Sequence, residues 1–219
     1  MKKIKNIMLK QNQLYVWDSI AESWHNLRRT PLLDIIKDLS AKWVPGKLLD
    51  VGCGNCRNVI PFAKHGFECY GIDFSKEMLR NAEKFAKQNN VKITLRRANV
   101  STIPYNDNTF DYVLCTAVLH HIGSRQERKK VLLEIKRVLK NRGQALISVW
   151  NKLQPKFLFS KKEKYIGWRV GDVTYYRYHY LFTYWELKRL IKEAGFKIVD
   201  HSGFLGKNII FIIKKEERR

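Results

Sequence analysis

The feature that most constrains the fold of this chain is an alternation of short apolar strands with amphipathic helices between residues 47 and 150. Residues 110–117 are mostly apolar, which is typical of a strand buried on both faces. The alternation predicts an α/β fold with a doubly wound, mostly parallel sheet, whose ligands bind at the carboxyl ends of the strands. The predicted strands are 47–51, 67–73, 91–96, 110–117 and 143–150, and the predicted helices are 58–65, 75–88 and 126–140.

Segments on either side of this alternation complete the predicted domain. Residues 10–42 are expected to be helical, with an interruption at Pro31, and a further helix is predicted over 184–194. Strands over 196–201 and 207–213 are expected to form a hairpin, giving seven strands with the last one antiparallel. We divide the single domain, 1–219, into an N-terminal helical lid (1–42), a cofactor-binding core (43–150), a basic and aromatic substrate insertion (151–182) and a C-terminal helix and hairpin (183–219).

The charge of the chain is strongly positive. It has 42 Lys and Arg residues against 20 Asp and Glu, a net charge of +22. Such a surplus favours a polyanionic partner, so nucleic acid is expected first, an anionic membrane surface second, and a lysine-rich proteome bias is the third interpretation. No apolar run is long enough to span a membrane and residues 1–10, MKKIKNIMLK, lack a signal-peptide pattern, so we expect a cytoplasmic protein.

The stretch LLDVGCGNC contains a C-x-x-C motif, Cys53 and Cys56, which suggests metal or redox chemistry. A zinc site needs a second pair of ligands at similar spacing, and the sequence offers none. We therefore interpret both residues as small thiols in a crowded turn and predict no metal. Cys69 and Cys115 are expected to be reduced as well.

The same stretch also contains Asp50-x-Gly52-x-Gly54, a strand that runs into a glycine turn. The dinucleotide fingerprint needs a third glycine, but Arg57 stands at that position. A carboxylate at Asp50 repels a pyrophosphate and attracts a cationic ligand. Asp73 closes the next strand and can accept from the hydroxyls of a ribose.

These residues resemble the class I S-adenosylmethionine-dependent methyltransferases, whose cofactor has a ribose, a sulfonium and an ammonium but no phosphate. Motif I is LDVGCGNC, the ribose acid lies in GIDFS, and the adenine position is Ala98-Asn99-Val100. Cys56 replaces a frequent third glycine and Asn99 a usual Asp, although the Asn99 carbonyl can still accept from the adenine amino group. The resemblance implies a Rossmann-like fold and S-adenosylmethionine as cofactor. The implied cofactor contacts are Asp50, Gly52, Cys53, Gly54, Asn55, Asp73, Phe74, Asn99, Val100, Thr116 and Ala117.

Further stretches resemble the tRNA wobble-uridine carboxymethyl methyltransferases, which include the methyltransferase domain of the animal AlkB-like tRNA hydroxylase. They are WDSIAESWHNLRRTP at 17–31, AVLHHI at 117–122 and GQALISVW at 143–150. RYHYLF at 177–182 resembles the R-Y-Y-H-L-F of that family with His and Tyr exchanged. The resemblance implies methylation of the carboxylate of 5-carboxymethyluridine at wobble position 34 of tRNA, which gives the methyl ester.

A carboxylate acceptor sets the chemistry that the site must provide. It is ionised at neutral pH, so the reaction requires positioning by a cation and no strong general base. Arg28 is the first candidate for this cation and Arg177 the second. His120 and His121 follow strand 110–117, and we expect one to contact the uridine or its carboxymethyl group while the other caps the strand. Two satisfied core histidines are the alternative.

The segment 151–182 interleaves cations with aromatic rings, a combination that suits a single-stranded anticodon loop. The alternative is that the rings pack over the sheet and only the lysines are exposed. Residues 125–142 add a basic helix face, either solvated or a remote tRNA contact. The resemblance also implies a small zinc-binding activator protein beside strand 91–96. The predicted RNA contacts are Lys152, Lys156, Lys161, Lys162, Lys164 and Arg169.

Two other functions stay open at this point. A small-molecule methyltransferase of the quinone or sterol type would share motif I and the Leu-His-His stretch at 119–121. A non-catalytic RNA-binding protein on a decayed methyltransferase fold would account for Cys56 and Asn99.

Overall fold

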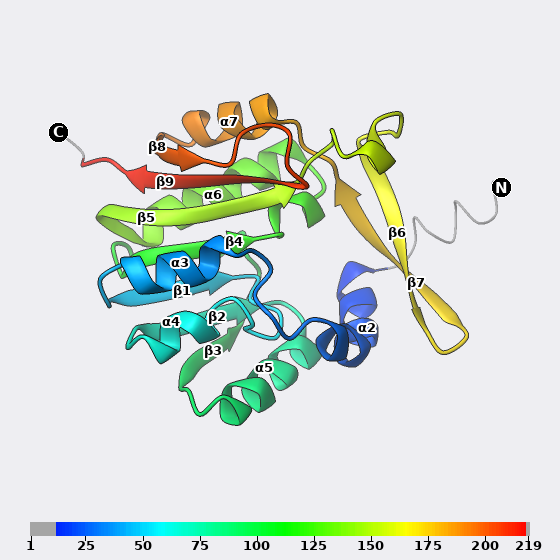
Figure 1. Ribbon diagram of the computed structural model, residues 1–219, viewed down its shortest axis with the longest axis horizontal. Helices are drawn as coiled ribbons and strands as arrows, with labels where there is room; N and C mark the ends of the chain where they lie inside the picture. The colour runs from blue at the N-terminus through cyan, green and yellow to red at the C-terminus, as the bar shows by residue number, and fades with distance from the viewer. Residues whose placement is uncertain (1–11, 218–219) are drawn as a thin grey trace.

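The computed structural model describes residues 12–217 (Figure 1). Two predictions concern residues outside this range: the lack of a signal peptide in 1–10, and the start of the first helix at residue 10. Among the described residues, no helix combines the length and the apolar character that a membrane crossing needs.

Seven strands form one sheet in the order β3-β2-β1-β4-β5-β9-β8 (Figure 1). All are parallel except β9, which runs antiparallel to both of its neighbours. The predicted fold class is therefore confirmed, including the single antiparallel strand. The strands are β1 (Lys47–Val51), β2 (Glu68–Asp73), β3 (Ile93–Arg97), β4 (Phe110–Thr116), β5 (Leu139–Trp150), β8 (Phe196–His201) and β9 (Asn208–Lys215).

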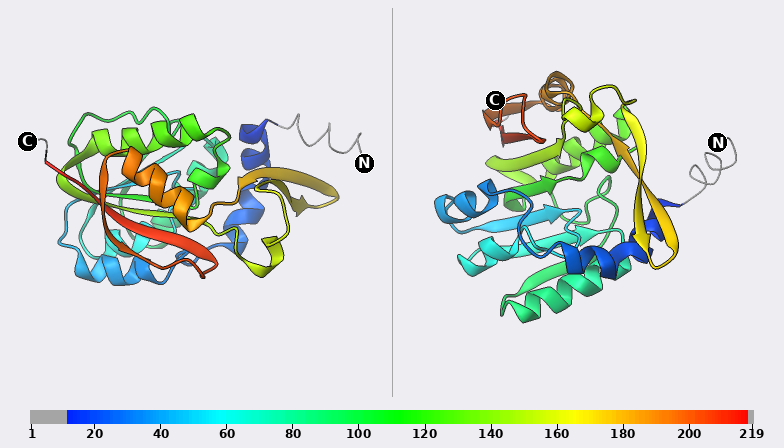
Figure 2. Two further views of the ribbon diagram at one scale, coloured as in Figure 1. Left: turned by 90° about the horizontal axis from the view of Figure 1, so that it is seen from above. Right: turned by 45° about the vertical axis from the view of Figure 1, so that its right-hand side comes forward.

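Helices cover both faces of the sheet (Figure 2). Successive residues of the central strand β4 alternate between two apolar clusters, with Val113 and Cys115 in one and Leu114 in the other. This alternation follows from the period of two in a strand, and it explains why β4 is apolar on both faces. One cluster includes α6 (Arg125–Val138) and α7 (Tyr184–Glu193), and the other α3 (Ile35–Lys42), α4 (Ile60–Lys64) and α5 (Lys76–Gln88).

Side-chain caps begin three of these helices. Ser75 caps α5 as predicted, since its Oγ accepts a hydrogen bond from the backbone N–H of Met78 at 3.1 Å. Capping boxes begin α6 at Ser124 and α7 at Thr183. Each cap satisfies backbone donors that the first helical turn leaves free.

The predicted boundary between the helix over 126–140 and the strand that follows it was wrong. The helix expected over 126–140 ends at Val138, and β5 begins at Leu139 instead of Gly143. Val138 and Leu139 continue the apolar spacing of a helix, but Leu139 pairs with Phe110 of β4. Tertiary pairing therefore overrides the local periodicity.

The segment 151–182, expected only as an insertion, contains a separate two-stranded sheet. Its strands are β6 (Glu163–Val170) and β7 (Val173–Tyr180), joined by a turn at Gly171 with φ +57°. Tyr, Trp, Ile and Val favour strands, so the signal was present in the sequence. We interpreted the basic and aromatic composition of residues 151–182 as a sign of RNA contacts and did not predict these strands. Two short 3-10 turns, η1 (Leu119–His121) and η2 (Pro155–Phe157), complete the fold.

The hairpin packs against α2 (Gln13–Leu27) beside the sheet (Figure 2). The Gln13 side chain bonds to the β7 backbone twice: Nε2 donates to Tyr176 O at 3.1 Å and Oε1 accepts from Tyr178 N at 2.9 Å. The indole Nε1 of Trp168 donates to Ser23 Oγ at 3.1 Å. Helix and hairpin therefore form one wall beside the carboxyl ends of the strands.

Candidate active site

A cavity of about 300 Å³ lies at the carboxyl ends of β1, β2 and β4, closed on the far side by α2 and the hairpin. It is lined by most of the residues predicted to act, from segments far apart in the sequence. Two predicted cofactor residues, Asp50 and Asn55, lie behind its wall. The predicted residues on its lining are Arg28, Gly52, Cys53, Gly54, Asp73, Phe74, Asn99, Val100, Thr116, Ala117, His120, His121 and Arg177.

The glycine turn between β1 and α4 is held against β2. The backbone N–H groups of Gly52 and Cys53 both donate to Ile72 O, at 2.8 and 2.9 Å. Gly52 has φ +71°, and an added Cβ would lie 2.6 Å from Cγ2 of Val118. The position therefore requires glycine, both for its backbone angle and for its space.

Cys56 also adopts a left-handed conformation, with φ +63°. This is the position at which the resemblance leads one to expect a third glycine. The backbone N–H of Cys56 donates to Cys53 O at 2.9 Å, and its side chain is fully buried. All four cysteines are buried thiols without disulfides. The interpretation of Cys53 and Cys56 as small residues in a crowded turn agrees with this geometry.

The carboxylate of Asp73 links the turn to α5. Its Oδ2 accepts from Gly54 N and its Oδ1 from Ser75 N, both at 2.9 Å. Burial raises the pKa of Asp73 to about 6, although these backbone hydrogen bonds oppose the rise. The carboxylate keeps spare acceptor capacity on the cavity wall, where hydroxyls of a ribose can donate to it.

Asp50 lies beneath the turn and makes no contact with the cavity, contrary to the prediction. Its side chain is fully buried, and neither carboxylate oxygen has a hydrogen-bond partner among the described residues. Burial and the nearby Asp73 raise the pKa of Asp50 to about 7, while Arg57 acts in the opposite direction. An unpartnered carboxylate of this kind makes its end of the cavity suited to a cation.

Asn55 was predicted to contact the cofactor, but it acts as a link between two segments. Its Nδ2 donates to Arg28 O at 2.8 Å and lies 2.9 Å from Nδ1 of His25. The residue is fully buried beneath the end of α2. It therefore positions the backbone of Arg28 relative to the glycine turn.

Asn99 lies on the cavity wall, but its carbonyl oxygen is already used. Oδ1 accepts from both the N–H and the Oγ of Ser101, at 3.0 and 2.9 Å. Two hydrogen bonds fill the acceptor capacity of an amide oxygen. The predicted contact from this oxygen to an adenine amino group does not match the geometry, and the amide nitrogen is the group left for a base.

Three arginines line the cavity, and no carboxylate of residues 12–217 lies within ion-pair distance of them. Arg28 and Arg177 lie over the ring of Trp168, 5.7 and 4.9 Å from its centroid. Arg57 lies 4.9 Å from the ring centroid of Trp24. Burial first and then the charge of Arg28 lower the pKa of both Arg57 and Arg177 to about 10.

The guanidinium of Arg177 is the least satisfied of the three. Its side chain is 8% exposed, and Nε has no hydrogen-bond partner in the described part of the chain. Nε of Arg57 is buried and unpartnered in the same way. A buried cation with free donors is costly unless an anion pairs with it. The arrangement is therefore suited to binding anionic groups.

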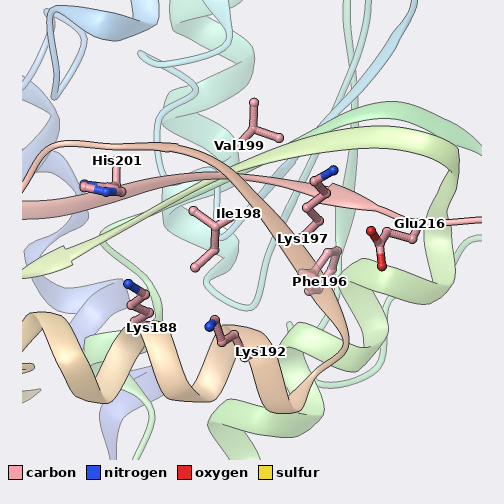
Figure 3. Close-up of a pocket in the computed structure, with 8 residues that line it drawn as sticks. All are labelled: Lys188, Lys192, Phe196, Lys197, Ile198, Val199, His201 and Glu216. Carbon is pink, nitrogen blue, oxygen red and sulfur yellow. The ribbon is translucent and has the colours of Figure 1, made fainter.

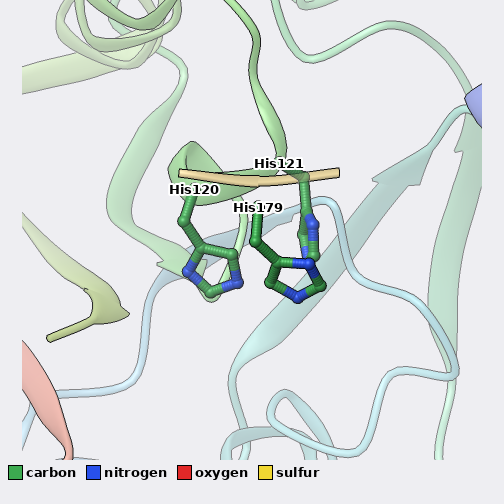
Figure 4. Close-up of side chains that lie close together, drawn as sticks. All are labelled: His120, His121 and His179. Carbon is green, nitrogen blue, oxygen red and sulfur yellow. The ribbon is translucent and has the colours of Figure 1, made fainter. Parts of the chain in front are cut away.

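Three histidines gather at one wall of the cavity (Figure 4). His120 and His121 come from η1 and His179 from β7, and their nearest nitrogens all lie within 4.8 Å of one another. Burial is the main cause that lowers the pKa of each: to about 4 in His121, to about 2 in His179, and well below the usual value in His120. All three are therefore neutral at neutral pH.

Hydrogen bonds to the backbone assign a tautomer to each ring. His120 Nδ1 accepts from the N–H of Trp150 at 3.1 Å, so its Nε2 carries the proton. His121 Nδ1 faces Tyr178 O at 2.8 Å and His179 Nδ1 faces Arg177 O at 3.0 Å, so these two nitrogens donate. Only His121 and His179 therefore keep a free lone pair on Nε2. A metal bound by all three rings would require His120 either to lose its Nε2 proton or to move it to Nδ1 and lose the hydrogen bond from Trp150.

The residues predicted to bind RNA are partly engaged within the protein. Lys152 donates to Phe157 O and Leu158 O, both at 2.7 Å, and Lys162 pairs with Glu186. These two lysines tie their own segments together. Lys156 and Lys164 lie over the Phe157 ring, Lys161 is exposed, and Arg169 bonds to Gly171 O and Asp172.

A separate hollow, without contact to the candidate site, lies between α7 and the edge strand β8 (Figure 3). Lys188, Lys192 and Lys197 line it, together with Glu216 and the ring of His201. It contains none of the residues predicted to act. The cavity at the carboxyl ends of the strands is therefore the candidate site.

Sequence reasoning missed two groups in this cavity. Arg57 entered only as the residue that breaks the dinucleotide fingerprint, and its own charge was the available signal. His179 entered only as half of the exchanged pair in RYHYLF. In the structure its ring stacks on Trp150, with centroids 4.7 Å apart, and lies 4.4 Å from the ring of His121.

Known proteins show similarity to this chain at several levels. Residues 49–147 match the methyltransferase domain family. A protein of Encephalitozoon cuniculi named as a methyltransferase is 33% identical over 162 residues, which cover 70% of this chain and 71% of that protein. The ubiquinone biosynthesis O-methyltransferase of Rickettsia akari is 31% identical over 124 residues, 56% of this chain and 48% of that protein. The chain thus spans about half the length of that second relative.

Among solved structures, the CcbJ methyltransferase of Streptomyces caelestis aligns with a TM-score of 0.78. The alignment covers 94% of this chain and 100% of that one, at 13% sequence identity. At this identity the likeness concerns the fold, and the substrate has to be argued from the site.

Proposed function

This chain belongs to the S-adenosylmethionine-dependent methyltransferases, and we propose that its acceptor is the carboxylate of 5-carboxymethyluridine at the wobble position of tRNA. The product is the methyl ester. The observation that carries this proposal is a set of three arginines around one cavity, Arg28, Arg57 and Arg177, which have no carboxylate partner among residues 12–217.

The cofactor S-adenosylmethionine fits the end of the cavity at the glycine turn. Asp73 has acceptor capacity for the ribose, and the unpartnered carboxyl group of Asp50, buried behind this end of the cavity, favours a cationic ligand nearby. Gly52 leaves no space for a side chain where the backbone approaches Val118. When bound, the cofactor supplies a methyl group activated by the positive sulfur.

Two anions would meet three cations in the loaded site. Arg57 follows the glycine turn, so we assign it to the carboxylate of the cofactor. Arg177 lies on β7 beside the histidines, so we assign it to the carboxylate of the acceptor. The charge of Arg28 lowers the pKa of both Arg57 and Arg177, so Arg28 is close enough to support either carboxylate.

For methyl transfer to a carboxylate, the main task of the protein is to position the acceptor relative to the methyl group of the cofactor. The acceptor carboxylate is ionised at neutral pH and attacks with its own lone pair, so no proton has to be removed. Arg177 orients the acceptor carboxylate. The rings of Trp17 and Trp168 lie beside the Arg177 guanidinium and limit the access of water to this ion pair. The three histidines are neutral, so they do not compete with Arg177 for the negative charge of the acceptor carboxylate.

The strong positive charge supports RNA as the carrier of this carboxylate. A net charge of +22 exceeds what a single carboxylate requires, and it matches a partner with many phosphates. β3 is an edge strand of the sheet, and a small zinc-binding activator beside it remains part of the proposal.

A quinone-type phenol is the second candidate, because the chain is similar to a ubiquinone biosynthesis O-methyltransferase. A phenol has a pKa near 10 and needs a base to ionise it. The histidines at this site have lowered pKa values, about 4 and about 2 for His121 and His179, which makes them weak bases. This favours the carboxylate acceptor.

The deciding experiment measures methyl transfer from labelled S-adenosylmethionine into tRNA that carries 5-carboxymethyluridine, with mass analysis of the nucleosides. We expect the methyl ester, with and without a zinc-binding activator as separate arms. Transfer to a catechol and none to tRNA would establish the second candidate. Absence of cofactor binding would point to an RNA-binding protein on a decayed fold.

A further inference from the structure

A second cavity, of about 270 Å³, lies between the N-terminal ends of α6 and α7. Arginines and one exposed indole dominate its wall. Trp185 is 68% exposed, which is unusual for so large an apolar side chain. The charged and aromatic residues that line it are Arg125, Arg128, Arg189, Glu186, Trp185, Tyr180 and Phe182.

This cavity is adjacent to the candidate active site. Ile122 lines the active site, and Arg128 on the other side donates Nε to Ile122 O at 2.9 Å and a terminal nitrogen to Gly123 O at 2.8 Å. The segment 122–123 therefore lies between the two cavities. Phe182, which lines the second cavity, forms a β-bridge with Asn151, the residue after the end of β5.

The cations of this second cavity differ in how they are used. Arg125 pairs with Glu193 at 2.6 Å, and Arg128 lies 3.6 Å from the centroid of the Tyr180 ring. Glu186 bonds to Lys162, which offsets its charge. Arg189 is exposed, and its charge adds to the hydrogen bond from Arg125 in lowering the pKa of Glu193, but the Arg189 side chain forms no hydrogen bond or ion pair with the described residues. It is therefore the cation most available to a ligand.

We propose that this cavity binds a nucleotide that flanks the acceptor uridine in the same RNA strand. Trp185 stacks on the base and Arg189 holds a phosphate. A ring for a splayed base beside a cation for the backbone is the combination that single-stranded RNA requires. The proposal rests on the proposed function for the identity of the RNA, and it adds a second subsite.

The test measures equilibrium binding of a synthetic anticodon stem-loop by fluorescence anisotropy, with the variants Trp185→Ala and Arg189→Glu. We expect each to raise the Kd roughly tenfold. The Arg189→Glu variant should also reduce the slope of log K against log salt by about one or more. S-adenosylmethionine affinity should stay within about twofold, because the cofactor lies in the other cavity.

The matched control is Arg80→Glu on α5, an exposed arginine whose substitution changes the net charge by the same amount. An equal loss of RNA affinity in this control would overturn the subsite in favour of diffuse attraction, and unchanged affinity in both cavity variants would overturn it directly. Binding needs no turnover. A wild-type protein that binds the stem-loop through Trp185 and Arg189 but methylates no carboxymethyluridine, with or without a zinc-binding activator, would disprove the proposed function and leave the RNA-binding subsite intact.

Discussion

The backbone N–H of Trp150 donates to Nδ1 of His120 at 3.1 Å, and this bond places the proton of the neutral ring on Nε2. One member of the histidine cluster is therefore a donor toward the cavity, while its two neighbours present lone pairs. Three histidines this close together are typical of a metal site. Here, however, the ring of His120 presents a proton rather than a lone pair to the cavity, so the cluster is suited to hydrogen bonding.

We expect divalent zinc to leave the protein unchanged for this reason. Adding zinc at a small molar excess should raise the Tm by less than about 1 °C, since two imidazoles alone give an incomplete site. Differential scanning fluorimetry measures the shift, and His179→Phe serves as the comparison. A zinc-dependent rise in Tm of several degrees that His179→Phe abolishes would contradict the tautomer assignment.

The buried histidines should make stability depend on pH. In the folded state the pKa of His179 is about 2, below its usual value of 6.5, so the unfolded chain takes up the proton first as the pH falls. The stabilisation is complete above pH 6.5 and is lost progressively below it. Asp50 and Asp73, whose pKa values are raised, act in the opposite direction over about pH 4 to 7.

A single substitution isolates the contribution of the histidine. Relative to wild type, His179→Phe should gain about 2 kcal/mol of stability at pH 5 compared with pH 7.5, since 1.5 pH units lie below the unfolded pKa. Any packing cost of the new ring is common to both pH values. Urea unfolding at the two pH values gives the difference, and an equal effect at both would show that His179 titrates normally in the fold.

Arg177 should determine affinity for a carboxylate acceptor. Arg177→Met retains an apolar stem between Trp17 and Trp168 but removes the guanidinium, so the KM of the acceptor should rise roughly 10- to 100-fold. Arg177→Lys should give an intermediate value because it keeps the charge and loses the planar fork. Steady-state kinetics and calorimetric cofactor binding check both.

The control for this series is Arg142→Met, because Arg142 is an exposed arginine near the amino end of β5 that pairs with Glu217. It should leave the KM within about twofold. A loss of cofactor affinity in Arg177→Met as large as the rise in KM would assign Arg177 to the cofactor instead.

Gly52 should be essential for cofactor binding because of its space as well as its backbone angle. In Gly52→Ala the new methyl group meets Val118 at 2.6 Å, so we expect cofactor affinity to fall roughly tenfold or more. Gly66→Ala is the matched control, since Gly66 has φ +82° and no atom within 4 Å of an added Cβ. Both variants carry the conformational cost, about 1–2 kcal/mol, but only the first should lose cofactor affinity. Isothermal titration would show equal affinities if the contact with Val118 were unimportant.

The sequence by itself determined the sheet, the glycine turn and most of the cavity lining. Strand and helix periods are local, so β1, β2 and the Ser75 cap of α5 could be read from short windows. Because parallel strands end at one edge, Asp73, Thr116 and His120 had to meet there. Those predictions depend only on the order of the strands and helices and on the parallel direction of the strands, and they need no knowledge of side-chain packing.

Only the tertiary structure decided which groups face the cavity and which support it. Asp50 and Asn55 have motif positions that suggest ligand contacts, yet both are buried behind the wall by the path of the turn. The hairpin β6–β7 folds back on α2 and places Arg177 and His179 beside residues that are distant in the sequence, such as His121. Such contacts come from long-range packing, which no local sequence period encodes.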